Sequence, residues 1–232
     1  MVKLLNYLNG FGFGHATIAR EVNACLKFWR NPTIIIDAGG NQGLWTREML
    51  SRNAHSKIVI FEPNKDNVRH LLEYYGSNSR VSIVAKAVGS KVSKAILYSD
   101  YAGSGIASLS NRRLSHFNVE FNHKEEVELT TLDHEVPGGN VDIIKMDIEG
   151  HELEALKGAQ KLLENVKVIQ FEFGGANIDS RTYFQDFFYF LNERHFTIYR
   201  ITPFGLVKVE KYNERMENFI TTNYIVTNNK FI

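Results

Sequence analysis

The sequence predicts an α/β fold with a doubly wound, mostly parallel seven-stranded sheet, an antiparallel edge and a small β insertion. Short apolar runs that fit buried strands alternate along the chain with patterns that fit helices. Four of these strand-helix units follow one another, and each strand ends in an acid or a small residue. The chain closes with two strands that bracket a turn, which predicts the antiparallel edge.

The composition limits the number of domains and the class of partner. The chain has 232 residues, of which 44% are hydrophobic, enough for one α/β domain with a small appendage. Lys and Arg total 27 against 26 Asp and Glu, so no whole-molecule field attracts nucleic acid or an anionic membrane. The single cysteine excludes an internal disulfide, and no signal peptide or long apolar run is evident. We expect a cytoplasmic protein that binds neither nucleic acid nor membrane.

Two regions are expected on either side of residue 33. Residues 1–32 form an N-terminal extension, and residues 33–232 form the main domain, with strands and a loop inserted at about 92–132. The extension holds a Gly/Phe segment and a helical pattern over Ala16–Trp29, which ends before Pro32. It is either a lid over the carboxyl edge of the sheet or a packing helix with a leader, and the sequence favours neither.

The first strand and the turn after it carry the main binding signal. Ile34–Ile36 is β-branched and apolar throughout, as expected of a strand buried on both faces, and an acid ends it. Glycines follow, before a helix that we expect over Leu44–Leu50. Glycine allows positive φ and lets a ligand approach the backbone N–H groups, and such turns are where open α/β sheets bind ligands. The expected binding residues of this turn are Asp37, Gly39, Asn41 and Gly43.

The spacing and charge of this turn favour one cofactor over another. The glycines do not follow the G-x-G-x-x-G pattern of dinucleotide sites. The carboxylate of Asp37 would repel a pyrophosphate, whereas it would attract the ammonium and sulfonium groups of S-adenosylmethionine. We therefore expect S-adenosylmethionine as the cofactor. A nicotinamide-dependent oxidoreductase on the same sheet is the alternative.

The next two strands predict where a nucleoside would lie. Lys57–Phe61 is apolar, and Glu62 follows it about 20 residues after the last glycine, the separation at which an acid binds both ribose hydroxyls. The other interpretation of Glu62 is an acid near the start of a helix over Asn64–Tyr75. Arg80–Ala85 is the third strand. Small apolar residues that suit the face of an adenine ring follow it: Ala87 and Val88.

An insertion follows the third strand. Val92–Tyr98 and Glu126–Leu132 alternate as expected for an antiparallel pair. The loop between them, residues 99–125, is long, and loops of that length in compact domains tend to be functional or disordered.

The second half of the chain repeats the strand-helix pattern. Val141–Met146 is a fourth strand, followed by Asp147 and by a helix that reaches Leu163, and Val166–Phe173 is a fifth strand that carries Glu172 near its end. Arg181–Arg194 has a wide apolar face and is expected to be a core helix. The last two strands are expected at Phe196–Thr202 and Phe219–Thr227, with a further short strand between them.

The acids at the strand ends are expected to meet at one rim of the sheet. Carboxylates gathered without partners repel one another, so a binding site explains Asp37, Glu62, Asp147 and Glu172 better than packing does. Lys145, which lies within an apolar strand, could pair with Asp147 or Glu172. This pattern of units is the class I methyltransferase, Rossmann-like architecture.

Methyl transfer from S-adenosylmethionine needs an acceptor held in line with the methyl group, and a neutral acceptor also needs a group that takes its proton. Asp147 is the first candidate because it stands at the end of the fourth strand, where we also expect it to contact the cofactor, and Glu149 is the second. His151 titrates in a convenient range, and Glu172 lies at the same rim. Acids at one rim could also hold magnesium or calcium, but no spacing fixes such a site and we expect no metal.

Several motifs resemble those of the FkbM-type S-adenosylmethionine-dependent methyltransferases. Ile36–Gly43 is close to the first motif of that family, Phe61–Pro63 matches its second, and Ala87–Gly89 its adenine-side segment. The most specific match is Lys145–Glu152, with Leu156–Ala159 a turn later and Thr131–Asp133 before it. The resemblance covers roughly residues 33–175. Gly40 stands where the family usually has Ala, and Ala107–Leu109 lacks one hydroxyl of the family pattern.

The resemblance implies O-methylation of a hydroxyl on a sugar, glycan or secondary metabolite. Two further classes of function stay open besides the oxidoreductase. One is a non-catalytic module that partners a glycosyltransferase. The other is a nucleic-acid methyltransferase, for which the chain offers a basic-aromatic stretch but no Asn/Asp-Pro-Pro-aromatic motif after the fourth strand. That stretch comprises Arg112, Arg113, His116, Phe117, Phe121 and Lys124.

Overall fold

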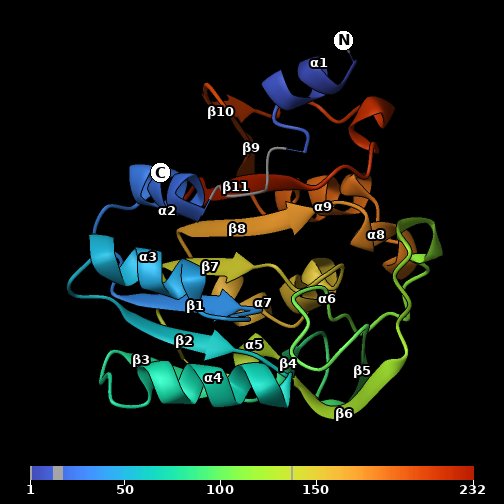
Figure 1. Ribbon diagram of the computed structural model, residues 1–232. Helices are drawn as coiled ribbons and strands as arrows, with labels where there is room; N and C mark the ends of the chain where they lie inside the picture. Colours follow the sequence, from blue (N-terminus) through green and yellow to red (C-terminus); the bar gives the residue numbers. More distant parts are fainter. Residues whose placement is uncertain (1, 13–17, 137) are drawn as a thin grey trace.

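The computed structural model describes residues 2–12, 18–136 and 138–232. Its main sheet has eight strands in the order β10-β9-β11-β8-β7-β1-β2-β3 (Figure 1). Five strands at one side are parallel, and β11, β9 and β10 form the antiparallel edge. In chain order the strands are β1 Ile34–Ala38, β2 Lys57–Phe61, β3 Val81–Val84, β7 Ile143–Met146, β8 Val168–Phe173, β9 Phe196–Thr202, β10 Gly205–Lys208 and β11 Thr222–Asn228.

This architecture confirms the predicted doubly wound, mostly parallel sheet with an antiparallel edge. The sheet has one strand more than the seven expected, because β10 folds back on β9 after the turn at Pro203 and adds an outer strand. The parallel strands all end on the same side of the molecule, at the right in Figure 1. The carboxyl ends of β1, β2, β7 and β8 therefore form one rim, where open α/β sheets bind ligands.

Helices cover both faces of the sheet. On one face α2, α3 and α4 pack against Ile35, Ile58 and Ile143, and on the other α5, α6, α7 and α9 pack against Ile36 and Ile144. Neighbouring isoleucines of one strand thus point to opposite faces, which is why the apolar run over β1 is continuous. The helices are α2 Ile18–Phe28, α3 Leu44–Arg52, α4 Lys65–Tyr75, α5 Leu132–Glu135, α6 Glu152–Lys157, α7 Gln160–Leu163, α8 Ala176–Ser180 and α9 Phe184–Asn192.

The helix expected to run to Leu163 is divided into α6 and α7. Gly158 lies so close to the Gly89 carbonyl that a Cβ there would be 2.0 Å from its oxygen. Asp133 accepts hydrogen bonds from the backbone N–H groups of Lys161 (2.9 Å) and Leu162 (3.0 Å), and so caps the first turn of α7. The break lets the chain stay close to the segment that enters the insertion.

The insertion forms a second, three-stranded sheet in the order β4-β6-β5. β5 (Ser93–Ser99) pairs antiparallel with β6 (His123–Thr130), as the alternation predicted, and β4 (Ala87–Val88) pairs parallel with β6. Residues 100–122 connect β5 to β6 and include only the short 3₁₀ turn η1 (Ser115–Phe117). The insertion lies against the rim of the main sheet (Figure 1).

The N-terminal extension contributes one helix to the core. In α2, Val22 and Cys25 pack with the side chains of α3 and the sheet. Residues 13–17, which include His15 and the expected helix start at Ala16, lie outside the described residues, so the lid remains a prediction. A first helix, α1 (Val2–Leu8), precedes it near β10, and the Arg200 guanidinium lies 4.4 Å from the centre of the Phe11 ring. Within the described part of the chain, no helix has the length and apolarity needed to cross a membrane.

Candidate functional site

The turn after β1 is held against the ends of β2 and β7. The N–H groups of Gly39 and Gly40 donate to the Phe61 carbonyl at 2.9 and 3.1 Å. Gly39 has a φ of 79°, and a Cβ there would lie 1.9 Å from the Asp147 carbonyl oxygen, so no other residue fits without moving the backbone. The sequence pattern thus correctly identified a turn that needs glycine.

Asp37 lies beneath this turn and does not line a pocket. Its side chain is fully buried, its Oδ2 accepts from the Thr46 hydroxyl at 2.7 Å, and its Oδ1 is 3.0 Å from Lys145 Nζ. Lys145 Nζ also donates to the Gly39 carbonyl at 2.8 Å. The prediction that Asp37 contacts a cofactor directly is therefore wrong, since both of its oxygens serve the turn.

Lys145 pairs with Asp37, whereas Asp147 or Glu172 had been expected as its partner. Burial lowers the pKa of Lys145, but the nearby carboxylates, Asp37 first among them, more than offset this and raise the pKa above its ordinary value. The pair is a charged support for the turn. Gly43, the remaining predicted turn residue, is also structural: its carbonyl accepts from the Tyr75 hydroxyl at 2.8 Å.

Glu62 fixes the next turn and also lines a pocket. Its carboxylate accepts from the N–H of Asn41 at 2.7 Å and from the N–H of Asn64 at 2.9 Å, while Asn64 itself caps α4. Burial raises the pKa of Glu62 above its ordinary value, although these backbone hydrogen bonds oppose the shift. Each carboxylate oxygen keeps a further lone pair, so both interpretations of Glu62 fit the structure.

The predicted binding segments meet in one pocket, which we call the β1/β2 pocket. It encloses about 560 Å³ of empty space, including the part open to solvent, a size usual for small-molecule sites. Several separate segments of the chain line it, including the turns after β1 and β2, the insertion and the loop after β7. Its walls include six of the predicted cofactor residues and two further predicted catalytic residues: Gly39, Asn41, Glu62, Ala87, Val88, Asp147, Glu149 and His151.

Two polar atoms in this pocket have no partner among the described residues. They are Asn41 Oδ1 and His151 Nδ1, and both are shielded from solvent. Burial lowers the pKa of His151, which favours the neutral ring that can accept a hydrogen bond there. Because buried polar atoms in native proteins are nearly always satisfied, these two indicate a ligand with hydrogen-bond donors.

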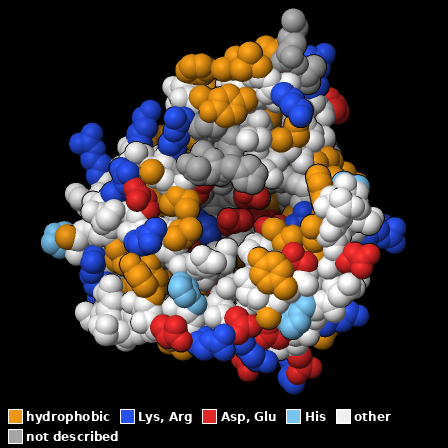
Figure 2. All heavy atoms as spheres, viewed as in Figure 1, with side chains coloured by type: hydrophobic (Ala, Val, Ile, Leu, Met, Phe, Trp, Pro, Cys, Tyr) orange, Lys and Arg blue, Asp and Glu red, His pale blue; other side chains and the backbone are white. Residues whose placement is uncertain are grey.

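A second pocket opens on the other side of Asp147, and we call it the β7/β8 pocket. Acidic side chains gather in a central hollow of the face drawn in Figure 2. The pocket shares Gly39, Asn41 and Asp147 with the first pocket. Its carboxylates come from α2, β7 and β8: Glu21, Asp147 and Glu172.

Glu172 is the predicted catalytic residue that lies apart from the other three. It lines only the β7/β8 pocket, where burial and then Asp147 and Glu149 raise its pKa well above the ordinary value. Asp147 is exposed at the boundary of the two pockets. Asp147 is thus the only one of the four candidates that borders both pockets in the described residues.

Glu149 is held in an ion pair. Arg112 Nη1 lies 2.6 Å from Glu149 Oε2, and Arg112 Nε lies 3.4 Å from Asp179 Oδ2. Burial, followed by the charge of Asp147, raises the pKa of Glu149, and the Arg112 guanidinium opposes that shift. This pairing engages the carboxylate that the sequence offered as the second candidate base.

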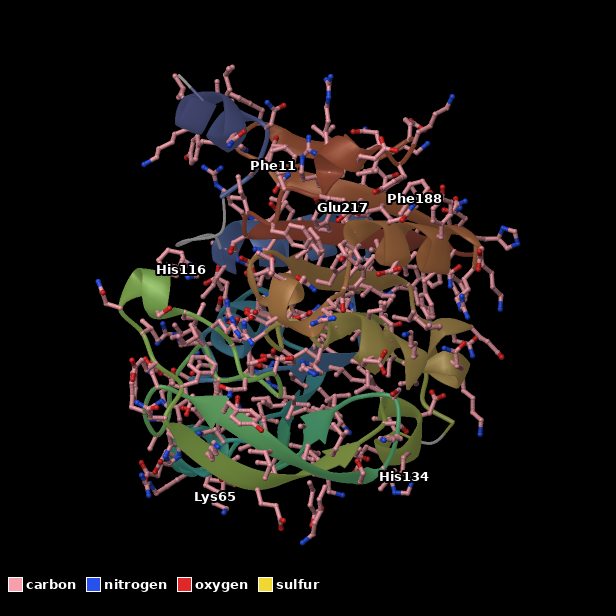
Figure 3. All side chains as sticks on the ribbon, turned by 90° about the vertical axis from the view of Figure 1, so that its right-hand side faces the viewer. Phe11, Lys65, His116, His134, Phe188 and Glu217 are labelled. Atoms are coloured by element: carbon pink, nitrogen blue, oxygen red, sulfur yellow. The ribbon has the colours of Figure 1, made fainter. Side chains whose placement is uncertain are left out.

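The basic-aromatic stretch does not form one surface. Arg112 is buried in the ion pair with Glu149, and Phe121 is buried as well. His116 lies at the outer edge of the insertion (Figure 3), next to the exposed Phe117. Lys124 lies on β6, over the Tyr98 ring. Arg112, at the centre of this stretch, is therefore engaged with Glu149 and is not free on the surface to contact a nucleic acid.

Other acids near the rim have structural partners. Glu152, at the start of α6, accepts from the N–H groups of Ile148 (2.9 Å) and Gly150 (3.2 Å), and burial raises its pKa to about 7. Glu154 pairs with Lys157, as expected for an acid in the first helical turn. Over residues 2–12, 18–136 and 138–232, no group of three or more His, Cys, Asp or Glu side chains is arranged to hold a metal ion.

Sequence reasoning missed the pocket residues that come from other elements. The inserted segment supplies Ser104, Gly105, Ala107 and Leu109 to the β1/β2 pocket. The unusual length of that loop and the resemblance of Ala107–Leu109 to the family pattern were the signals of a role for it. The β7/β8 pocket also receives residues that no motif marked, among them Glu21, Trp45 and Asn223.

Comparisons with known proteins agree with this geometry. The model of the methyltransferase FkbM domain matches residues 37–200. A solved methyltransferase FkbM from Methylobacillus flagellatus KT is 17% identical with a TM-score of 0.52; the match covers 84% of this chain and 43% of that one, so this chain spans less than half its length. No curated protein matches the sequence.

Two solved proteins described as rRNA methylases are similar over nearly their whole length. The protein from Streptococcus thermophilus is 12% identical with a TM-score of 0.50, and the match covers 90% of this chain and 94% of that one. The putative rRNA methylase from Clostridium thermocellum is 8% identical with a TM-score of 0.51, over 91% and 96%. At these identities the likeness shows a shared fold.

Proposed function

The chain belongs to the methyltransferase FkbM domain family, and from this premise we propose that it transfers a methyl group from S-adenosylmethionine to a hydroxyl of a sugar, glycan or secondary metabolite. The observation that carries the proposal is the β1/β2 pocket. It gathers Gly39, Asn41, Glu62, Ala87 and Val88 from three distant segments, in the arrangement expected for a nucleoside and its ribose.

The residues of the β1/β2 pocket fit S-adenosylmethionine. Glu62 would accept hydrogen bonds from the ribose hydroxyls with its remaining lone pairs, and Ala87 and Val88 would cover the adenine ring. Asn41 Oδ1 and His151 Nδ1 would gain donors for atoms that lack them among the described residues. When bound, the cofactor supplies a methyl group already activated by its sulfonium.

The β7/β8 pocket is the proposed place of the acceptor. It meets the first pocket at Gly39, Asn41 and Asp147, so an acceptor there would lie beside the cofactor's reactive end. Holding the acceptor oxygen about 3 to 3.5 Å from the methyl carbon can lower the barrier by as much as about 7 to 11 kcal/mol. Carboxylates accept hydrogen bonds from hydroxyls and repel phosphates, which favours a neutral polyol over a nucleic acid.

Asp147 is the proposed base. Its carboxylate stands between the two pockets, so it can take the proton of the acceptor hydroxyl as the new oxygen-carbon bond forms. Glu149 is engaged by Arg112, and the raised pKa of Glu172 favours a protonated carboxyl that orients the acceptor by a hydrogen bond. Lys145 and Asp37 act beneath the site by fixing the Gly39 carbonyl.

The test is transfer of labelled methyl from S-adenosylmethionine to a panel of acceptors. The panel contains neutral sugars and polyols, phosphorylated sugars, and ribosomal RNA. We expect label on a neutral hydroxyl compound and none on RNA. Label on RNA alone would support the nucleic-acid alternative and overturn the proposed acceptor class, and saturable binding of NADH without binding of S-adenosylmethionine would overturn the proposed chemistry.

A further inference from the structure

The wall of the β1/β2 pocket that faces the main sheet comes from the insertion. Residues 104–109, which connect β5 towards η1, contribute Ser104, Gly105, Ala107 and Leu109 to the lining. These residues lie far along the chain from the turns after β1 and β2 that form the opposite wall. The closed shape of the pocket therefore depends on how this segment, residues 104–113, is held.

Contacts with Glu149 and Asp179 hold the segment to the rim. The Ser108 hydroxyl donates to the Glu149 carbonyl at 2.7 Å, and Arg112 Nη1 lies 2.6 Å from the Glu149 carboxylate. Arg112 Nε lies 3.4 Å from Asp179 Oδ2, and the N–H of Arg113 donates to Asp179 Oδ1 at 3.2 Å. Glu149 thus binds the segment through both its backbone and its side chain.

The Arg112–Glu149 pair is well placed to control this attachment. The two side chains are only 10% and 18% exposed, so water screens their attraction weakly. Glu149 has a φ of 53°, an uncommon conformation for a residue other than glycine, and its neighbour Gly150 has a φ of 97°. The loop after β7 is therefore turned so that the Glu149 carboxylate faces the insertion while Asp147 borders the two pockets.

We propose that Arg112 is a positioning residue for the cofactor: through Glu149 it holds residues 104–113 closed over the β1/β2 pocket. This inference rests on the proposed function for the identity of the ligand. It separates two roles within one short loop, because Asp147 faces the reactants and Glu149 fastens the wall. Since coupling between sites is reciprocal, a ligand in the pocket must in turn strengthen the attachment of the segment.

The first test needs no ligand. Hydrogen exchange of the Arg113 amide, which donates to Asp179, reports whether the segment is attached to the rim. Arg112→Gln is expected to speed this exchange at least about tenfold, because it leaves a buried carboxylate without its partner. Arg113→Gln is the matched control: it removes the same charge from the same segment, but the Arg113 side chain is exposed and its backbone contact remains.

The second test measures calorimetric binding of S-adenosylhomocysteine. Arg112→Gln is expected to weaken binding roughly tenfold or more, and Arg113→Gln less than about twofold. Arg112→Lys keeps the charge but loses the planar fork, so it is expected to fall between the two and serves if Arg112→Gln does not fold. In the double variant Arg112→Gln, Glu149→Gln, the loss should be smaller than the sum of the single losses.

The outcomes separate this inference from the proposed function. If the wild type binds no S-adenosylhomocysteine but Arg112→Gln alone frees the segment, the proposed cofactor is wrong and the positioning role stands. If Arg112→Gln leaves both the exchange and the binding unchanged, or if Arg113→Gln has the same effects, the positioning role is wrong. Additive losses in the double variant would likewise show that Arg112 does not act through Glu149.

Discussion

The ends of β1 and β2 differ from the ends of β7 and β8, although all four carry acids. Asp37 and Glu62 are buried, and their oxygens are engaged: those of Asp37 by the side chains of Thr46 and Lys145, and those of Glu62 by the backbone N–H groups of Asn41 and Asn64. Asp147 and Glu172 reach the pockets, and both border the β7/β8 pocket. The same sequence pattern, an acid after an apolar strand, therefore supports a turn in one half of the rim and lines the β7/β8 pocket in the other.

The difference follows from where counter-charges and donors are available. The first pair of acids meets Lys145 and the free N–H groups of two turns, which compensate for burial. Asp147 and Glu172 form no direct ion pair among the described residues, and burial together with the charges of Asp147 and Glu149 raises the pKa of Glu172. Asp37 therefore supports the fold alone, Glu62 both fixes a turn and lines the β1/β2 pocket, and Asp147 and Glu172 line the β7/β8 pocket.

Replacing Glu62 is expected to have the largest effect on binding. Glu62→Ala removes the acceptor of the Asn41 N–H and the proposed ribose ligand, so S-adenosylhomocysteine should bind roughly 10² to 10⁴-fold more weakly by calorimetry. Glu126→Ala, an exposed change on β6, is the control and should bind normally. Unchanged binding of S-adenosylhomocysteine by Glu62→Ala would show that Glu62 is not a cofactor ligand.

Breaking the buried pair under the turn is expected to cost the most stability. Lys145→Met leaves Asp37 charged and buried, and should lower the free energy of unfolding by about 3 to 5 kcal/mol in denaturant titrations. Lys94→Met breaks the exposed pair with Glu126 and should cost less than about 1 kcal/mol. Equal losses in the two variants would contradict the structural role given to the β1 acid.

Replacing Asp147, at the end of β7, should lower the rate of methyl transfer without weakening cofactor binding. Asp147→Asn keeps the size of the side chain but cannot take a proton, so methyl transfer to a responsive acceptor should fall roughly 10² to 10⁴-fold. Binding of S-adenosylhomocysteine should stay within about threefold of the wild type. A normal rate in Asp147→Asn would assign the proton to another group.

The smallest expected effect is on the pH dependence of stability. Burial raises the pKa of Glu152 in the folded protein to about 7 from its ordinary value of 4.5, so the folded state binds more protons than the unfolded state between these values. This group therefore makes the protein less stable as the pH rises from about 4.5 to about 7. In thermal unfolding, Glu152→Gln should reduce the fall in Tm over that range, and an unchanged pH profile would show that Glu152 is not responsible.

Much of the fold could be predicted because its signals are local. The continuous apolar run over Ile34–Ile36 and the glycines after it identified β1 and its turn, and the alternation of the insertion identified the β5–β6 pair. The boundaries were less certain, since tertiary contacts decide them: Gly158 must approach Gly89, which divides one expected helix into α6 and α7. The eighth strand depends on a turn whose partner strand is not evident from its own four residues.

The site could be predicted only as far as the rim. Motif residues identified most of one wall of the β1/β2 pocket, but the sequence could not show that Lys145 would choose Asp37 over Asp147 or Glu172. It also could not show that Arg112 would turn inwards to Glu149. These pairings join segments that are distant in the sequence, and charge alone allows several partners for each.

The most direct measurement is a pair of calorimetric titrations of the free wild-type protein, one with S-adenosylhomocysteine and a separate one with NADH. The account predicts saturable binding of one S-adenosylhomocysteine per chain and no heat of binding with NADH, because the turn after β1 lacks a dinucleotide spacing and the pocket suits one nucleoside. Saturation by NADH with no response to S-adenosylhomocysteine would contradict it.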